Sequence, residues 1–212
     1  MAQTAINVCR RALLRVGDTD TVNSIESPQT EGEKYCAEFY DQARRETLRK
    51  HVWNFAKRRI EISKEVSGPL FGFSARYKLP TDFVRIVQVG SDIRKTLYYD
   101  YAVEGGYLLA DGIAQDDGEL YLVYIRDEID LNKWDAAALE LLVLYLAEKL
   151  AFPLTKKQSL VTAIQEEIRS KAVEAKGVDG QDQPPKRVER SRMVETRRSG
   201  LRRNNQYEGY YF

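Results

Sequence analysis

Histidine and cysteine are scarce in this chain of 212 residues, which holds one histidine and two cysteines. Cys9, Cys36 and His51 lie far apart in the sequence, and none stands in a CxxC or HxxxH spacing. A structural zinc site, a haem-attachment motif or a disulfide framework needs such spacings or more of these residues. The sequence therefore predicts no metal, no cofactor and no disulfide scaffold.

Long apolar runs are also missing. The longest uninterrupted one, residues 141–147, has seven residues, whereas a helix that crosses a bilayer needs roughly 18–20. The first residues, MAQTAINVCRR, contain no apolar core of the kind found in a signal peptide. With 43% hydrophobic residues, the composition predicts a soluble globular protein of a cytoplasm-like compartment, with no membrane span.

Common catalytic signatures are absent as well. The sequence has no GxSxG, GxxxxGK[ST], GxGxxG or HExxH motif, which argues against hydrolases, nucleotide-binding enzymes and metalloproteases that use them. His51 is the only possible histidine base, and its place beside Trp53 favours packing or capping over general-base catalysis. A pair of carboxylates for glycan hydrolysis stays open, because the separation that matters is spatial. We predict a protein that is not an enzyme.

A cluster of carboxylates raises the question of calcium. Asp111, Asp116, Asp117 and Glu119 stand close together, but their spacing does not match the order of ligands in an EF-hand loop. Asp116, Asp117 and the following glycine are typical of a hairpin turn. We therefore interpret these side chains as turn carboxylates.

Charge is nearly balanced overall, with 33 Lys and Arg against 32 Asp and Glu, yet it is unevenly distributed. Residues 186–203 hold eight basic and two acidic side chains, which leaves a net charge of −4 on residues 1–185. Breaker-rich residues (VDGQDQPP) precede this basic stretch, and aromatic residues close the chain. Arginine and aromatic side chains anchor many protein interfaces. The predicted partner-binding residues are Arg187, Arg190, Arg192, Arg197, Arg198, Arg202, Arg203, Tyr207, Tyr210, Tyr211 and Phe212.

Periodic apolar residues predict four helices. The first covers about residues 2–16 and stops at Gly17, and the second starts at Ser27-Pro28 and runs to about Lys57. The third, residues 134–152, is apolar nearly all round and should end at Pro153. The fourth runs from an N-cap at Thr155 to about residue 176, because Gly180 and two following prolines should prevent residues 178–185 from continuing a helix.

Between the second and third helices, the composition changes to that of β-strands. Seven of the thirteen tyrosines lie between Tyr77 and Tyr124, and the segments 83–90, 95–103, 106–111 and 119–127 are rich in β-branched and aromatic residues. Glu104-Gly105-Gly106 should form a hairpin turn. We predict an α+β fold: a four-helix bundle (1–69 and 127–177), an antiparallel β domain inserted between helices two and three (70–126), and an extended C-terminal arm (178–212).

Two aromatic and three basic residues stand close together at residues 53–59, Trp-Asn-Phe-Ala-Lys-Arg-Arg. Such a run could stack on single-stranded nucleic acid. The alternative, which we favour, is that Trp53 and Phe55 pack where the second helix meets the β domain, while the cations are solvated. The basic arm likewise allows three roles: a solvated linker, a nucleic-acid-binding arm, or a peptide that docks on a protein. Its aromatic end favours docking.

Four segments in order resemble the tail tubular protein A, or head-to-tail adaptor, of short-tailed bacteriophages. They are HVWNFAKRRIEI (51–62), YKLPTDFVRIVQV (77–89), YAVEGGYLLAD (101–111) and the segment 119–157. Val52 departs from the family pattern, in which proline is common. The residues that match the family and should pack at the junction of the two domains are Trp53, Phe55, Tyr77, Leu79, Pro80 and Trp134.

The resemblance, which spans about residues 4–176, implies a structural virion protein of the tail or neck, assembled in the host cytoplasm. Members of this family form a ring, usually of twelve copies, between the portal protein above and the tail nozzle protein below. Genomic DNA passes through the ring without sequence-specific binding. Two alternatives remain: a nucleic-acid-binding protein that uses the basic arm and, less favoured, a cell-wall or glycan hydrolase.

Overall fold

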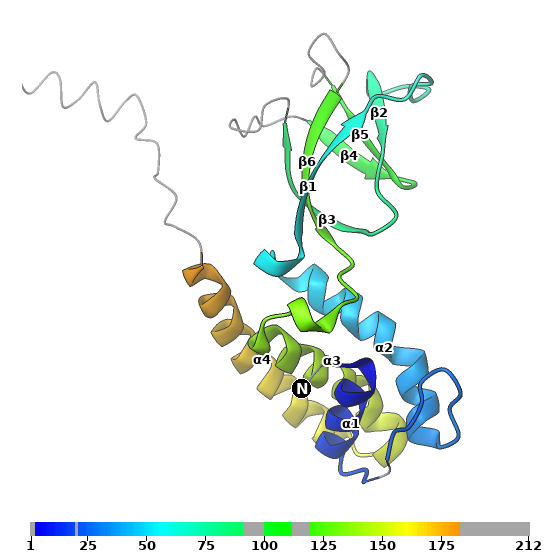
Figure 1. The fold of residues 1–212 in the computed structure, drawn as a ribbon, viewed down its shortest axis with the longest axis vertical. Helices are drawn as coiled ribbons and strands as arrows, with labels where there is room; N and C mark the ends of the chain where they lie inside the picture. The colour runs from blue at the N-terminus through cyan, green and yellow to red at the C-terminus, as the bar shows by residue number, and fades with distance from the viewer. Residues whose placement is uncertain (1–2, 20, 91–99, 112–118, 183–212) are drawn as a thin grey trace, which may run out of the picture. The chain divides into compact units, whose positions relative to one another are not determined.

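The computed structural model describes residues 3–19, 21–90, 100–111 and 119–182, and the statements below concern these residues. They form a mixed α+β fold in which the strands lie between the second and third helices along the chain (Figure 1). The helices are α1 (Ala5–Val16), α2 (Glu31–Lys50), α3 (Ala136–Thr155) and α4 (Gln158–Gln181), with short 3-10 turns η1 (Asn54–Ala56) and η2 (Leu131–Lys133). The strands are β1 (Lys57–Ser63), β2 (Ala75–Lys78), β3 (Phe83–Gly90), β4 (Tyr101–Glu104), β5 (Tyr107–Ala110) and β6 (Glu119–Arg126). The predicted α+β class is confirmed, while its finer description as a bundle with an inserted domain stays a prediction.

The first two helices are fixed by local capping. Thr4 caps α1, and Gly17 ends it with a positive φ of 84°, which glycine adopts without strain. The predicted start of α2 at Ser27-Pro28 is wrong, because the helix begins after Thr30. The Thr30 hydroxyl accepts from the Glu33 amide, and the Glu33 carboxylate accepts from the Thr30 amide, which satisfies two amides that a helix start leaves free.

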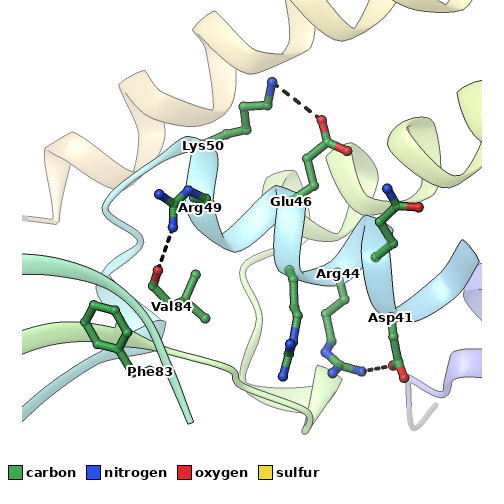
Figure 2. A pocket seen from close by; sticks show the side chains of 9 residues that line it. Asp41, Arg44, Glu46, Arg49, Lys50, Phe83 and Val84 are labelled. Atoms are coloured by element: carbon green, nitrogen blue, oxygen red, sulfur yellow. Dashed lines mark hydrogen bonds and ion pairs between the residues drawn. The ribbon is translucent and has the colours of Figure 1, made fainter. Parts of the chain in front are cut away.

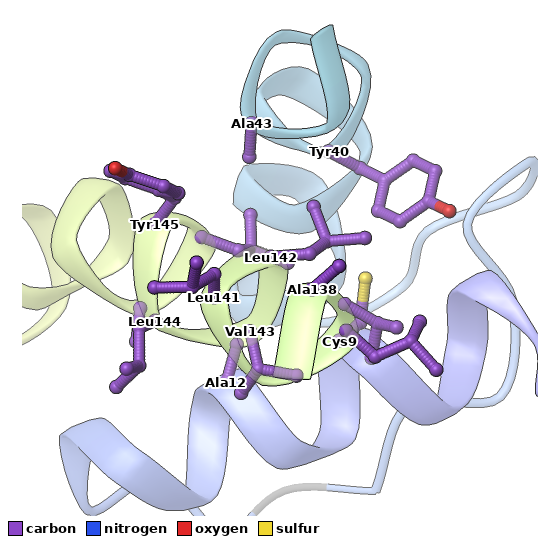
Figure 3. Packing of buried hydrophobic residues seen from close by; sticks show 14 of the residues in the cluster. Cys9, Ala12, Tyr40, Ala43, Ala138, Leu141, Leu142, Val143, Leu144 and Tyr145 are labelled. Atoms are coloured by element: carbon purple, nitrogen blue, oxygen red, sulfur yellow. The ribbon is translucent and has the colours of Figure 1, made fainter. Parts of the chain in front are cut away.

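The all-round apolar character predicted for the third helix agrees with its place in the structure. Helix α3 packs against α1, α2 and α4, and Figure 3 shows its side chains directed toward both α1 and α2. Leu142 and Leu144 are completely buried, as are Cys9 of α1 and Ala43 of α2. Both cysteines are free and buried.

The ends of α3 and α4 differ from the prediction. Pro153 lies inside the last turn of α3, and Lys156 in the left-handed conformation (φ 57°) ends that helix. A proline so near the end removes one helical hydrogen bond without breaking the turn that follows. Thr155 is therefore not the N-cap of α4, which begins after Lys157 and continues to Gln181, through residues assigned to the arm.

Two three-stranded antiparallel sheets make up the β region, with strand orders β1-β6-β3 and β2-β5-β4. The second helix stops at Lys50, so the prediction that it reaches Lys57 is wrong: residues 57–63 form β1, which pairs along its whole length with β6. This strand lies within the range 1–69 that the sequence pattern assigned to helices. β4 and β5 are joined by Gly105-Gly106, both with positive φ, as a tight two-residue hairpin requires.

Most of the buried apolar side chains form two separate clusters. One joins the four helices and takes in Val84 of β3 and Ile125 of β6. The other lies among the strands and includes Tyr77, Leu108 and Leu122. None of the helices in the described ranges is long and apolar enough to cross a membrane.

Candidate functional site

An aromatic group marks the place where the helices meet the strands. Trp53 follows α2 and is 1% exposed; its indole Nε1 donates to the carbonyl of Thr47 at 2.8 Å. Phe55 stacks on Trp53, with ring centroids 5.9 Å apart, and lies 5.1 Å from the ring of Trp134, which precedes α3. These contacts fix the start of β1 against the chain that leaves β6. We call Trp53, Phe55 and Trp134 the aromatic junction.

The last turn of α4 is attached to the same region by Asp179. One carboxylate oxygen of Asp179 lies 2.9 Å from His51 Nε2, and the other accepts from the Asn54 amide at 2.9 Å. The side-chain amide of Asn54 donates to the backbone carbonyl of Asp179 at 2.7 Å. His51 is therefore held as a structural partner of Asp179, and its ring lies edge-on to Trp53.

A cleft of about 1160 Å³ is lined by residues of α2 and by the start of β3 (Figure 2). Its volume is slightly above the range for small-molecule pockets, roughly 300–1,000 Å³. The lining combines four cations and two carboxylates of α2 with the first residues of β3. The residues are Asp41, Gln42, Arg44, Arg45, Glu46, Arg49, Lys50, Phe83 and Val84.

Arg44 and Asp127 form the most buried ion pair of the cleft region, since each side chain is only 8% exposed. The pair is bidentate, with Arg44 Nε 2.9 Å from Oδ1 and Nη2 3.0 Å from Oδ2 of Asp127. Burial alone would raise the pKa of Asp127, but hydrogen bonds from Arg44 and Arg45 outweigh it and lower that pKa. Burial likewise opposes ionisation of Arg44, yet its bonds to Asp127 leave its pKa raised. The pair therefore stays charged and connects α2 to the end of β6.

The other cations of the cleft are also engaged. Arg49 Nη1 donates to the carbonyl of Val84 at 3.0 Å, and Arg85 Nη1 donates to the carbonyl of Arg49 at 3.2 Å. Lys50 forms an ion pair with Glu46, drawn as a dashed line in Figure 2, and Lys50 Nζ lies 3.5 Å from Glu46 Oε1. Arg45 is 65% exposed and Lys50 57% exposed, so their outer ends can reach a partner. The arrangement braces α2 against β3 and leaves a charged surface open to solvent.

The structure divides the predicted junction residues between two places. Trp53, Phe55 and Trp134 meet in the aromatic junction, whereas Tyr77 and Leu79 are buried in the strand cluster. Pro80 is half-buried, and its carbonyl accepts from the Phe83 amide at 3.1 Å where the chain turns into β3. The predicted partner-binding residues 187–212 lie outside the described residues.

Sequence reasoning missed three residues of the site: Arg44, Asp127 and Asp179. Each is a charged side chain that is almost fully buried, and burial of a charge requires a partner that the local sequence does not reveal. Position 44 could have been suspected, because a helix period places it on the apolar face with Tyr40, Ala43 and Thr47.

The proposed turn carboxylates are only partly described. Asp111 accepts from the Ser74 amide at 2.6 Å, which is a structural role at the end of β5, while Asp116 and Asp117 fall outside the described residues. Among the residues that the structure describes, no group of three or more His, Cys, Asp or Glu side chains could hold a metal ion.

Comparison with known proteins adds no relative: no family model matches this chain, and no curated protein matches it significantly.

Proposed function

We propose that this protein is a structural head-to-tail adaptor of a short-tailed phage, which forms a ring of about twelve copies between portal and tail nozzle. The observation that carries the proposal is that two of the four family-like segments meet at the aromatic junction. Residues 51–62 supply Trp53 and Phe55, and residues 119–157 supply Trp134. Two of the four segments that carry the resemblance therefore meet in space, while Tyr77 and Leu79 of a third segment lie in the strand cluster.

The junction suits a protein that connects two larger assemblies. An adaptor must hold its helical and β parts in a fixed relative position, so that a contact made by one part determines the position of the other. Stacked rings, the bidentate Arg44–Asp127 pair and the Asp179 contacts all connect helices to strands or to the turn between them. Bidentate arginine–carboxylate pairs add geometric specificity as well as energy.

The charge distribution agrees with a channel protein. The net −4 on residues 1–185 would let phosphates pass with little adhesion, since each fixed phosphate contact adds affinity. The cations of the α2–β3 cleft already have carboxylate or carbonyl partners. This argues against nucleic-acid binding at the cleft, and the alternative that uses the basic arm is tested by salt dependence.

The test is electron microscopy of the purified full chain, alone and mixed with the portal ring of the same virus. Class averages should show closed rings, either alone or templated by the portal. A chain that stays monomeric beside portal rings would contradict the proposal. DNA affinity that falls steeply with salt would favour the alternative, because several arginines would then be neutralising phosphates.

A further inference from the structure

The loop between β1 and β2 carries three large apolar side chains that are almost entirely exposed. The relative exposures of Val66, Leu70 and Phe71 are 108%, 99% and 88%. All three lie on one loop within six residues of sequence, and large apolar side chains exposed close together mark interaction surfaces. We call these three residues the apolar knob.

The base of this loop is held at both ends. Arg76 Nη2 lies 2.7 Å from the hydroxyl of Ser67 and 3.3 Å from the carboxylate of Glu65. On the other side, the amide of Ser74 donates to Asp111 at 2.6 Å. Anchored ends reduce the conformational freedom that the loop would lose on binding. The knob is therefore presented to solvent by a braced loop.

A small apolar hollow lies on the outer face of the β1-β6-β3 sheet. Its volume is about 270 Å³, and its lining includes Tyr121 and Val123 of β6 and Gln88 of β3, together with the exposed charged residues Arg59 and Glu61 of β1. Side chains alternate along a strand, and Leu122 belongs to the core between the strands, so Tyr121 and Val123 face the other way. Val123 is only 8% exposed, yet it belongs to neither buried cluster. We call this the outer-sheet hollow.

We propose that the apolar knob of one copy inserts into the outer-sheet hollow of the next copy. The knob is exposed on its own chain and so does not fill its own hollow. The hollow is larger than the ~150 Å³ that accommodates a benzene ring, which leaves room for the ring of Phe71. Residues 66–73 carry no charge, and the charged residues of the lining, Arg59 and Glu61, are exposed, so their charged ends can stay in water beside the inserted loop.

The contact would join two different surfaces, which makes it heterologous, and contacts of this kind repeat from copy to copy around a ring. The inference rests on the proposed function in taking a second copy as the partner.

A lipid surface is less favoured, because Lys64 and Glu65 are the only charged residues among residues 64–74 and their charges cancel. Stable membrane attachment by one short apolar segment usually needs a basic patch beside it.

Directed cross-linking of the full chain tests the contact. A Phe71→Cys protein is mixed with a Gln88→Cys protein under mild oxidation; the native Cys9 and Cys36 are buried. We expect disulfide-linked dimers in severalfold higher yield than from Val173→Cys mixed with Gln88→Cys, since Val173 is an exposed apolar residue of α4. A Leu70→Ser/Phe71→Ser variant should associate with its own copies roughly tenfold or more weakly, at an unchanged melting temperature, as expected for loss of an interface anchor.

The outcomes separate this inference from the proposed function. Rings without the knob–hollow cross-link overturn the inference and leave the adaptor function standing. The cross-link without closed rings supports the contact and counts against the ring, and absence of both overturns both. Flotation of the chain with neutral phosphatidylcholine vesicles, lost in the Leu70→Ser/Phe71→Ser variant, would assign the knob to lipid and overturn the inference.

Discussion

Replacing Trp53 with alanine tests whether the aromatic junction holds the protein together. The side chain is 1% exposed, stacks on Phe55, lies edge-on to His51 and donates one hydrogen bond to Thr47. Truncating a buried tryptophan costs about 3–5 kcal/mol, because apolar contacts are lost and a cavity remains. That is a large share of the ~5–15 kcal/mol by which domains are usually stable.

A second variant separates the contribution of ring packing from that of the hydrogen bond to Thr47. Trp53→Phe keeps an aromatic ring but leaves the Thr47 carbonyl without its donor, which costs about 1–3 kcal/mol when the group is buried. We therefore expect stability to decrease from wild type to Trp53→Phe to Trp53→Ala. Val173→Ala is the control, since Val173 is 75% exposed on α4 and its loss should change stability by no more than about 0.5 kcal/mol.

The assay is urea unfolding followed by far-UV circular dichroism, because the substitution removes one of the two tryptophans that fluorescence would report. With a slope near 2 kcal/mol per molar urea, the Trp53→Ala midpoint should fall by roughly 1.5–2.5 M. Nucleic-acid binding is measured on the same samples. A Trp53→Ala protein that unfolds like the parent but has lost nucleic-acid binding would refute the packing role and favour a stacking platform.

Four further predictions follow from particular contacts. The Tyr77 hydroxyl is buried without a hydrogen-bond partner among the described residues, so Tyr77→Phe should leave the urea midpoint unchanged or raise it; a clear loss of stability would reveal a partner for the hydroxyl. Four backbone amides, from Asn23, Gln29, Thr30 and Ser24, hold the pKa of Glu33 at about 2, below its ordinary 4.5. Ionised Glu33 therefore stabilises the fold above pH 4.5, so the deficit of Glu33→Gln relative to wild type should shrink as the pH falls from 4.5 toward 2, and a pH-independent deficit would contradict this. Asp179→Ala should speed hydrogen exchange at the end of α4, whereas Glu174→Ala, which removes only an exposed pair with Lys171, should not. Deleting residues 204–212 keeps all eight arm cations and should abolish portal attachment without changing the melting temperature; attachment that survives this deletion but is lost when the arginines are neutralised would show that the arm acts by charge.

Local chemistry made several elements predictable from the sequence. Gly17 after an apolar periodic segment predicted the end of α1, and Gly105-Gly106 between two strand-like segments predicted the β4–β5 hairpin. In both cases the deciding factor is a positive φ that glycine adopts freely. The apolar character of residues 136–151 likewise indicated that other elements would cover every face of α3, because exposing any face would leave apolar side chains in water.

The helix ends and the second core depended on tertiary structure. Residues 57–63 follow a helix and are rich in charge, and they form a strand because β6 offers them a complete row of backbone partners. Tyr77 was expected beside Trp53 but lies in a different core, since the sequence shows burial without showing against which neighbour.

The sequence by itself determined the fold class, the central helix and the glycine turns, because these depend on residues close together in the chain. Only the tertiary structure decided where α4 ends. Gly177 and Gly180 each disfavour a helix by about 1 kcal/mol, yet α4 continues to Gln181 because Asp179 binds His51 and Asn54. Contacts between residues more than a hundred positions apart outweigh the local preference, and such contacts are not encoded in any short stretch of the sequence.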